Sequence, residues 1–167
     1  YTVNGVERDS YWLDRQGIDR GEPTRLLYAV HVLVGHHGIL SLTPVWLLSA
    51  WGMWLWLQSG DRARRNLALL IAALTLICLV FYIGLRPQED RNYGGMTSGF
   101  RWMFWFTPLW LVVMLPAADR LARSTAGVAF AAALLTLSAL SVSYPTWNPW
   151  TQPWIYHWLE WCGWQGF

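Results

Sequence analysis

Residues 91–102, RNYGGMTSGFRW, place two arginines around a stretch of glycine, threonine and serine. Guanidinium groups bind phosphate oxygens through charge-assisted hydrogen bonds, and glycine-rich turns can add backbone N–H donors. The pattern therefore predicts a loop that binds a lipid phosphate. The candidate residues are Arg101, Arg91, Ser98, Gly95 and Gly99. The alternative is an ordinary turn whose arginines reach lipid headgroups, because the glycines match no phosphate-loop signature.

Three histidines lie in the stretch HVLVGHHGILSLTP. Histidine is a common metal ligand, but His31 and His36 are five residues apart, which does not place them on one helical face. His36 and His37 are adjacent and point apart, and the acids within reach are Asp19 and Glu22. We therefore predict no metal site and no cofactor, and we expect His36 and His37 to line a cavity on the outer side of a membrane.

Carboxylates that could act in acid–base chemistry lie outside the apolar runs of the chain. Most are interpreted as solvated surface charges. They are Asp9, Asp14, Asp19, Glu22, Glu89 and Asp90. The apolar runs carry no internal charge, which argues against an ion channel or a proton relay built on them.

The composition is that of a membrane protein. Of 167 residues, 54 % are hydrophobic, 13 % are charged and 14 are tryptophan. The net charge of +2 gives no indication of nucleic-acid binding. Cys78 and Cys162 are far apart and form no disulfide or zinc pattern.

Four apolar runs meet the length criterion for a transmembrane helix, about 17–19 residues without charge. They are 39–57, 67–85, 102–118 and 125–142. The sequence therefore predicts an all-α polytopic membrane fragment, with four transmembrane helices in 39–142 and interfacial helices on either side. The fourth run is rich in small residues, which favours close packing inside a bundle.

Two further regions flank the predicted bundle. Residues 1–22 form an outer-side polar segment, and 23–38 contain an interfacial or re-entrant helix that is too short to span. The tail, 143–167, is rich in tryptophan. Its tryptophans recur at intervals of three or four, as on one helical face, and from about Pro153 we expect a helix in the outer interface. An alternative for these rings is stacking on sugars.

Arginine placement predicts the orientation. Arg62, Arg64 and Arg65 lie in one loop, and Arg120 and Arg123 in another, so the positive-inside rule makes that side cytoplasmic. Both ends of the chain and the glycine loop then lie outside. We expect a multi-pass protein of the bacterial inner (plasma) membrane.

The order of motifs resembles the C-terminal part of bacterial polytopic membrane proteins related to GT-C-type glycosyltransferases, many of them uncharacterised. Those proteins often carry a G-hydrophobic-x-S-P helix start and a later W-G-G-W-S-x-G-x-R loop. Here Tyr93-Gly94-Gly95, Ser98-Gly99 and Arg101 match the loop, and Ser41, Thr43 and Pro44 loosely match the helix start. Asn92-Tyr93 replaces an aromatic pair, and Met96 replaces tryptophan. The similarity covers about residues 35–120.

The resemblance implies transfer of a sugar from a polyprenyl-phosphate donor at the outer face, with Arg101 near the donor phosphate. In that family the catalytic carboxylate usually lies in a first outer loop, so we expect further N-terminal helices of the same protein as partners, besides membrane lipids. Whether the chain belongs to an enzyme stays open. The alternative is a non-enzymatic membrane scaffold or a subunit of a membrane complex.

Overall fold

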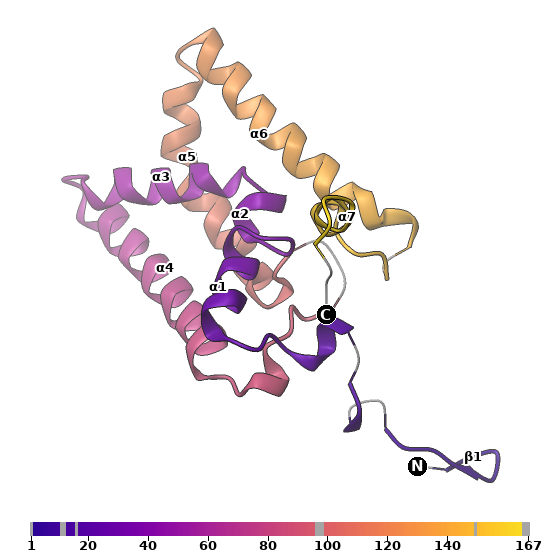
Figure 1. Cartoon of the computed structure of the whole chain (residues 1–167). Helices are drawn as coiled ribbons and strands as arrows, with labels where there is room; N and C mark the ends of the chain where they lie inside the picture. The colour runs from indigo at the N-terminus through magenta and orange to yellow at the C-terminus, as the bar shows by residue number, and fades with distance from the viewer. Residues whose placement is uncertain (1, 11–12, 16, 96–98, 149, 165–167) are drawn as a thin grey trace.

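The computed structural model describes residues 2–10, 13–15, 17–95, 99–148 and 150–164, and it is mostly helical (Figure 1). Within these residues, three helical segments are long and apolar enough to cross a membrane. They are Arg62–Leu85, Arg101–Leu121 and Thr125–Trp147. The predicted all-helical, membrane-type fold class is therefore confirmed, with three such segments rather than four.

Two of these segments begin at a capping side chain. Helix α4 (Arg62–Val80) starts after Asp61, whose Oδ1 accepts hydrogen bonds from the backbone of Ala63 and Arg64. Helix α6 (Thr125–Ser143) starts after Ser124, whose Oγ accepts from Gly127 N. Such caps satisfy N–H groups that the first helical turn leaves unpaired. They fix both helix starts in the short arginine-bearing loops.

The segments then change their helical form near the glycine loop. Helix α4 continues into a π-helical turn, η3 (Phe81–Leu85), and the next span opens with a 3₁₀ turn, η5 (Arg101–Phe106). Helix α5 (Thr107–Leu121) follows, with Pro108 in its first turn, where a missing N–H costs little. Helix α6 passes into the 3₁₀ turn η6 (Tyr144–Trp147).

The single helix predicted over residues 39–57 is divided in two. Helix α2 (Ile39–Leu42) ends at Thr43, whose hydroxyl donates to Ile39 O, and α3 (Trp46–Leu57) starts after Pro44, which has no N–H to continue a helix. The 12 residues of α3 extend about 18 Å, less than the ~30 Å hydrocarbon core. The apolar length of this run did not reveal the break.

Helix α3 packs closely against α5, and the residue before α3 is hydrogen-bonded to α6. A Cβ at Gly52 would lie 2.0 Å from the carbonyl oxygen of Val113, so the two backbones touch where α3 crosses α5. Val45 N donates to Ser138 Oγ of α6. Small residues at such crossings are typical of membrane helix pairs.

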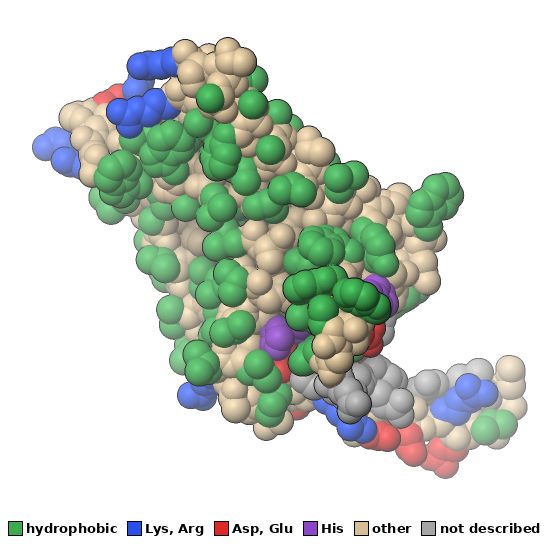
Figure 2. Space-filling model, turned by 45° about the horizontal axis from the view of Figure 1, so that its top comes forward, with side chains coloured by type: hydrophobic (Ala, Val, Ile, Leu, Met, Phe, Trp, Pro, Cys, Tyr) green, Lys and Arg blue, Asp and Glu red, His purple; other side chains and the backbone are tan. Residues whose placement is uncertain are grey.

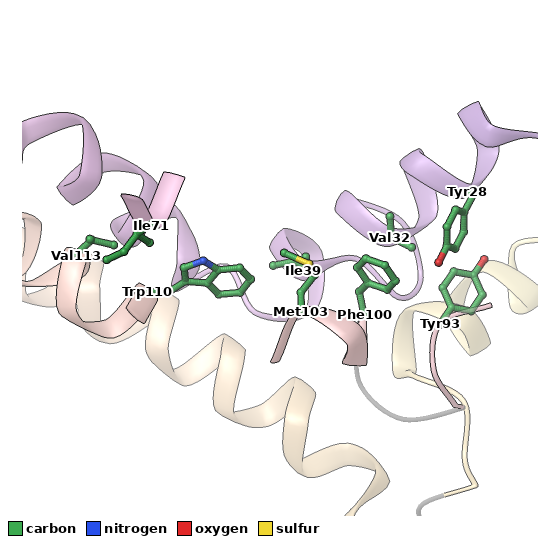
Figure 3. Packing of buried hydrophobic residues seen from close by; sticks show 9 residues of the cluster. All are labelled: Tyr28, Val32, Ile39, Ile71, Tyr93, Phe100, Met103, Trp110 and Val113. Atoms are coloured by element: carbon green, nitrogen blue, oxygen red, sulfur yellow. The ribbon is translucent and has the colours of Figure 1, made fainter. Parts of the chain in front are cut away.

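One hydrophobic core connects the helices to the glycine loop (Figure 3). It contains nine buried residues: Tyr28, Val32, Ile39, Ile71, Tyr93, Phe100, Met103, Trp110 and Val113. The ring of Phe100 meets the ring of Tyr28 edge-on at 5.9 Å between centroids. Because Tyr93 and Phe100 belong to this core, both ends of the glycine loop are fixed.

Shorter elements gather at the same end as the glycine loop. Helix α1 (Arg25–Leu33) is capped by Thr24, and its 9 residues confirm the short helix predicted there. Helix α7 (Trp154–Trp161) confirms a helix from about Pro153, and Trp154 Nε1 donates to Ser141 Oγ of α6. The other elements are η2 (Gly17–Arg20), η4 (Gln88–Asp90) and the strands β1 (Thr2–Val3) and β2 (Val6–Glu7), which pair in a small hairpin away from the helices (Figure 1).

The opposite end of the molecule carries the arginines of the two short loops. Figure 2 shows arginine side chains there and a largely hydrophobic surface along the helices. These exposed arginines are Arg62, Arg64, Arg65, Arg120 and Arg123. The long helices therefore separate the end that carries these two short loops from the end that holds the glycine loop.

Candidate functional site

A polar pocket of about 750 Å³ lies beside the glycine loop. We call it the arginine pocket. Its lining residues are Arg15, Asp19, Arg86, Asp90, Asn92, Gly94, Gly95, Arg101, Trp102 and Trp150. Three arginines face two aspartates there, so the lining has an excess of positive charge.

Two of the pocket arginines share one acid. Arg15 Nη1 lies 3.3 Å and Arg86 Nη2 lies 3.6 Å from the carboxylate of Asp90. The guanidinium of Arg86 also lies 5.5 Å from the ring centroids of Tyr82 and Trp102, which stack on each other. These contacts fix Arg86 as part of the pocket wall.

Arg101 differs from the other pocket arginines. It is exposed at the first residue of η5, where a candidate membrane-spanning segment begins. No carboxylate of the described residues lies within salt-bridge distance of it, and its charge lies 5.9 Å from the ring of Trp102. A Cβ at Gly95 would be 3.6 Å from Arg101 Nη1, so the loop backbone passes next to the guanidinium.

The glycines of the loop adopt backbone conformations that favour glycine. Gly94, Gly95 and Gly99 have φ of 83°, 131° and 95°, a region that L side chains rarely adopt. A Cβ at Gly94 would meet the indole of Trp102 at 3.1 Å. Asn92 Oδ1 accepts from Gly94 N and holds the turn. The missing side chains let the loop lie directly against the start of η5.

The predicted phosphate-binding residues do not all come together. Arg101 and Gly95 line the arginine pocket, but Arg91 is buried and does not. Gly99 packs near Phe104 instead, where an added Cβ would lie 3.2 Å from the ring. Ser98 lies outside the described residues.

Sequence reasoning did not select Arg86, Trp102 or Trp150 for this site.

Arg91 has a different role in the structure. Its guanidinium donates to the carbonyl oxygens of Glu22, Pro23 and Arg86, at 3.3 to 3.4 Å. In return, Glu22 N donates to Arg91 O. Arg91 therefore joins the polar N-terminal segment to the glycine loop.

A second polar group lies in the protein interior. Glu22, His31 and His36 form what we call the His–Glu cluster, in which one potential ligand atom from each residue lies within 4.8 Å of the others. All three side chains are buried. Helix α1 ends at Leu33, and the turn at Gly35 returns the chain, so the rings of His31 and His36 have centroids only 4.0 Å apart.

The cluster contains buried polar atoms without a hydrogen-bond partner among the described residues. They are Glu22 Oε2, His31 Nδ1 and His36 Nε2. Buried polar groups are nearly always paired, so three orphans in neighbouring side chains require an explanation. A group of this composition, two imidazoles and a carboxylate, is of the kind that holds divalent transition metals.

Other residues fix the orientation of the cluster. Tyr93 Oη donates to Glu22 Oε1, and His36 Nδ1 and His37 Nδ1 share a hydrogen bond of 2.6 Å. A Cβ at Gly35 would lie 2.6 Å from His31 Nδ1, so glycine leaves that nitrogen free of contact.

Burial determines the charge states in the His–Glu cluster. Burial, together with smaller contributions from the neighbouring His37 and His31, lowers the pKa of His36 to about 2. Burial also lowers the pKa of His31. The same loss of water raises the pKa of the Glu22 carboxyl, which the hydrogen bond from Tyr93 opposes. Both imidazoles are thus neutral, and each keeps one nitrogen lone pair.

His36 and His37, which we expected to line a cavity on the outer side, lie in the protein interior. Both side chains have no exposed surface, and they lie among aromatic rings rather than in the arginine pocket. His37 stacks on Tyr93 at 4.2 Å between ring centroids. From the tail, Tyr156 and Trp164 lie over His36, with centroids 5.5 and 5.3 Å away.

The fold and these sites together define a helical protein of the membrane type, with a basic pocket and a buried histidine–glutamate group at one end. Comparison of the chain with protein-family models, curated proteins and solved structures finds no match. The resemblance to GT-C-type glycosyltransferases therefore depends on the short motifs alone.

Proposed function

We propose that the arginine pocket binds the phosphate of a polyprenyl-phosphate sugar donor, as part of a GT-C-like membrane glycosyltransferase. The observation that carries this proposal is the position of Arg101. It is exposed in a pocket at the first residue of an apolar span and has no acidic partner among the described residues. At the start of such a span, a guanidinium is at the depth of lipid headgroups.

The residues of the arginine pocket have different roles in this proposal. Arg101 contacts the phosphate, Arg86 adds a second positive charge, and the backbone at Gly94 and Gly95 lets the phosphate approach closely. The exposed ring of Trp150 offers an apolar face for a sugar. No residue of this chain is assigned as the catalytic base.

In the proposed reaction, the bond between the anomeric carbon and the phosphate oxygen breaks while the acceptor oxygen attacks that carbon. The electron pair of the broken bond stays on the phosphate, and a carboxylate elsewhere in the enzyme takes the acceptor proton. Arg101 stabilises the charge that develops on the leaving phosphate.

The orientation belongs to the same proposal. The α3–α4 and α5–α6 loops lie at the end of the molecule away from the arginine pocket (Figure 1), and the positive-inside rule assigns them to the cytoplasm. The pocket and both ends of the chain then lie on the outer side of the bacterial inner membrane. In this arrangement α2 and α3 together form a fourth, broken crossing.

The test is lipid binding by the purified protein in nanodiscs. A polyprenyl phosphate is titrated while tryptophan fluorescence is recorded, with the matching polyprenol as the phosphate-free control. Loss of one charge-assisted contact in Arg101→Ala should raise the Kd for the phosphate about 10- to 100-fold, without affecting the polyprenol. Arg120→Ala is the matched control, because Arg120 is exposed at the opposite end of the same span.

Equal phosphate affinity in the wild-type protein and Arg101→Ala would overturn the assignment of Arg101. A polyprenyl phosphate that binds no better than the polyprenol would overturn the pocket as a phosphate site. Specific binding without sugar transfer, measured with the complete protein and a radiolabelled donor, would favour a lipid-binding subunit of a membrane complex over an enzyme.

A further inference from the structure

We propose that the His–Glu cluster is a metal site, in which Glu22, His31 and His36 bind one divalent transition-metal ion such as Zn²⁺. Sequence reasoning predicted no metal here. The new proposal depends on the geometry of the interior, and it is independent of the proposed lipid-binding function.

The three side chains converge, and each of them has an unsatisfied polar atom. One ligand atom from each side chain lies within 4.8 Å of the others, and each side chain has a buried atom without a hydrogen-bond partner among the described residues. If His36 Nδ1 donates its proton to His37 Nδ1, then His36 Nε2 carries the lone pair that a metal requires. When all three atoms present a lone pair, a water molecule can donate to only two of them, whereas one cation satisfies all three.

Little movement is needed to bind a metal ion. Ligand atoms about 2.1 Å from a tetrahedral zinc ion lie roughly 3.4 Å from each other. The cluster atoms are at most 4.8 Å apart, so the side chains close by no more than about 1.4 Å around zinc. Glu22 and the two histidines come from three positions on one short stretch of chain, so rotation of the side chains can supply that movement.

Other residues orient the ligands. A metal-binding histidine usually uses its second nitrogen in a hydrogen bond, and a metal-binding carboxylate is usually hydrogen-bonded too. His36 meets this expectation through His37, and Glu22 through Tyr93 Oη. Gly35 adds the space that His31 Nδ1 needs, because a Cβ there would lie 2.6 Å from that nitrogen.

The ligand set and its surroundings indicate the class of metal and its role. Two imidazole nitrogens with one carboxylate oxygen suit zinc and its neighbours in the first transition row, not calcium or magnesium. Aromatic rings of Tyr93, Tyr156 and Trp164 surround His36. A metal in this enclosed place would join Glu22 to helix α1 and to the turn after it, which is a structural role.

The experiment measures metal binding to the purified protein in detergent. The protein is treated with a chelator, dialysed and titrated with Co²⁺, whose visible d–d absorption reports the ligand field, and the bound Co²⁺ is then displaced by Zn²⁺. We expect one equivalent of Co²⁺ per chain, loss of the absorption on addition of Zn²⁺, and a higher melting temperature with Zn²⁺ bound.

Three variants remove one ligand each and keep similar side-chain size: Glu22→Gln, His31→Gln and His36→Gln. Each should weaken Co²⁺ binding at least 10-fold and lose the rise in melting temperature. The matched control is His157→Asn, which removes an exposed histidine that pairs with Glu160 on α7. This control should bind one equivalent as the wild type does.

The wild-type titration keeps the proposal falsifiable even if a ligand variant fails to fold. A folded wild-type protein that takes up no stoichiometric Co²⁺ or Zn²⁺ would overturn the metal site. Equal binding by wild type and folded ligand variants would also overturn it, since the metal would then lie elsewhere. Neither result affects the test of the arginine pocket, which uses a polyprenyl phosphate and no metal.

Discussion

The arginine pocket and the His–Glu cluster are neighbours with opposite chemistry. Asn92 and Gly94 line the pocket, while Tyr93 between them turns inward and donates to Glu22. The pocket is open and presents guanidinium donors, whereas the cluster is enclosed and presents lone pairs. One short stretch of chain thus serves both a candidate anion site and a candidate cation site, because successive side chains face in different directions.

The two arginines at the ends of the glycine loop also differ in being enclosed or open to solvent. Both arginines flank the glycine loop, and the sequence analysis predicts phosphate binding for both. Arg91 is 9 % exposed and its guanidinium binds backbone carbonyl oxygens, whereas Arg101 is exposed in the pocket. The difference shows that residue type alone does not determine whether an arginine stabilises the fold or is available to a ligand.

The largest effect on stability is expected for Arg91→Ala. This change leaves the carbonyl groups of Glu22 and Pro23 without their charged donor and should lower the free energy of unfolding by about 3 kcal/mol. Arg101→Ala should change it by less than about 0.5 kcal/mol, as a typical exposed substitution does. Thermal unfolding in detergent measures both, and equal losses would remove the distinction between the two arginines.

Tyr93→Phe tests the connection between the two regions. The change removes the hydroxyl that donates to Glu22 Oε1 and leaves a buried carboxylate oxygen unpaired, at a cost of about 2 kcal/mol in unfolding free energy. Loss of this orienting contact should also weaken Co²⁺ binding about 10- to 100-fold. Tyr144→Phe, at an exposed ring, is the control. If Tyr93→Phe has the same stability and Co²⁺ affinity as this control, the hydroxyl of Tyr93 does not orient Glu22.

Gly94→Ala should affect the arginine pocket and spare the cluster. Its φ of 83° is strained for alanine, and the new Cβ would lie 3.1 Å from Trp102. We expect a loss of about 1.5 kcal/mol in stability. The Kd for a polyprenyl phosphate should rise, while Co²⁺ affinity stays unchanged. If Gly94→Ala weakened both polyprenyl-phosphate binding and Co²⁺ binding, the arginine pocket and the His–Glu cluster would act as one unit.

A small effect is expected for Arg15→Ala. Arg15 pairs with Asp90 at 3.3 Å, but both side chains are partly exposed, and such pairs contribute about 0.2–1 kcal/mol. Asp90 also keeps Arg86 as a partner. The melting temperature should hardly move, which differential scanning calorimetry can check. A loss as large as that of Arg91→Ala would show that Arg15 is structural.

Much of the helical architecture could be predicted from apolar length. The runs 67–85, 102–118 and 125–142 are long and uncharged, each begins one or two residues after an arginine, and each lies in a long helical segment. The run 39–57 has the same composition but is divided near Pro44, because hydrophobicity does not report where backbone hydrogen bonds stop. The tryptophans of the tail likewise do not share one helix: Trp147 belongs to η6, and α7 begins at Trp154.

The candidate sites were less predictable. Arg101 and Gly95 were found because the glycine loop marks them, whereas Arg86 comes from the end of another helix and lacks such a signal. The His–Glu cluster was missed because the spacing of His31 and His36 was interpreted as if one helix continued. Glycine commonly follows the end of a helix, and the chain turns at Gly35 between the two histidines, which allows their rings to meet.

The contact between Gly52 and Val113 has a consequence for the biosynthesis of the protein. Helix α3 lies directly on the backbone of α5, which the ribosome makes roughly 60 residues later, or about 3–12 s at usual synthesis rates. During that interval α3 exists without its main packing partner. The apolar side chains of α3 are compatible with lipid, so α3 does not need α5 to cover them at once. The final position of α3 is set only when α5 packs against it.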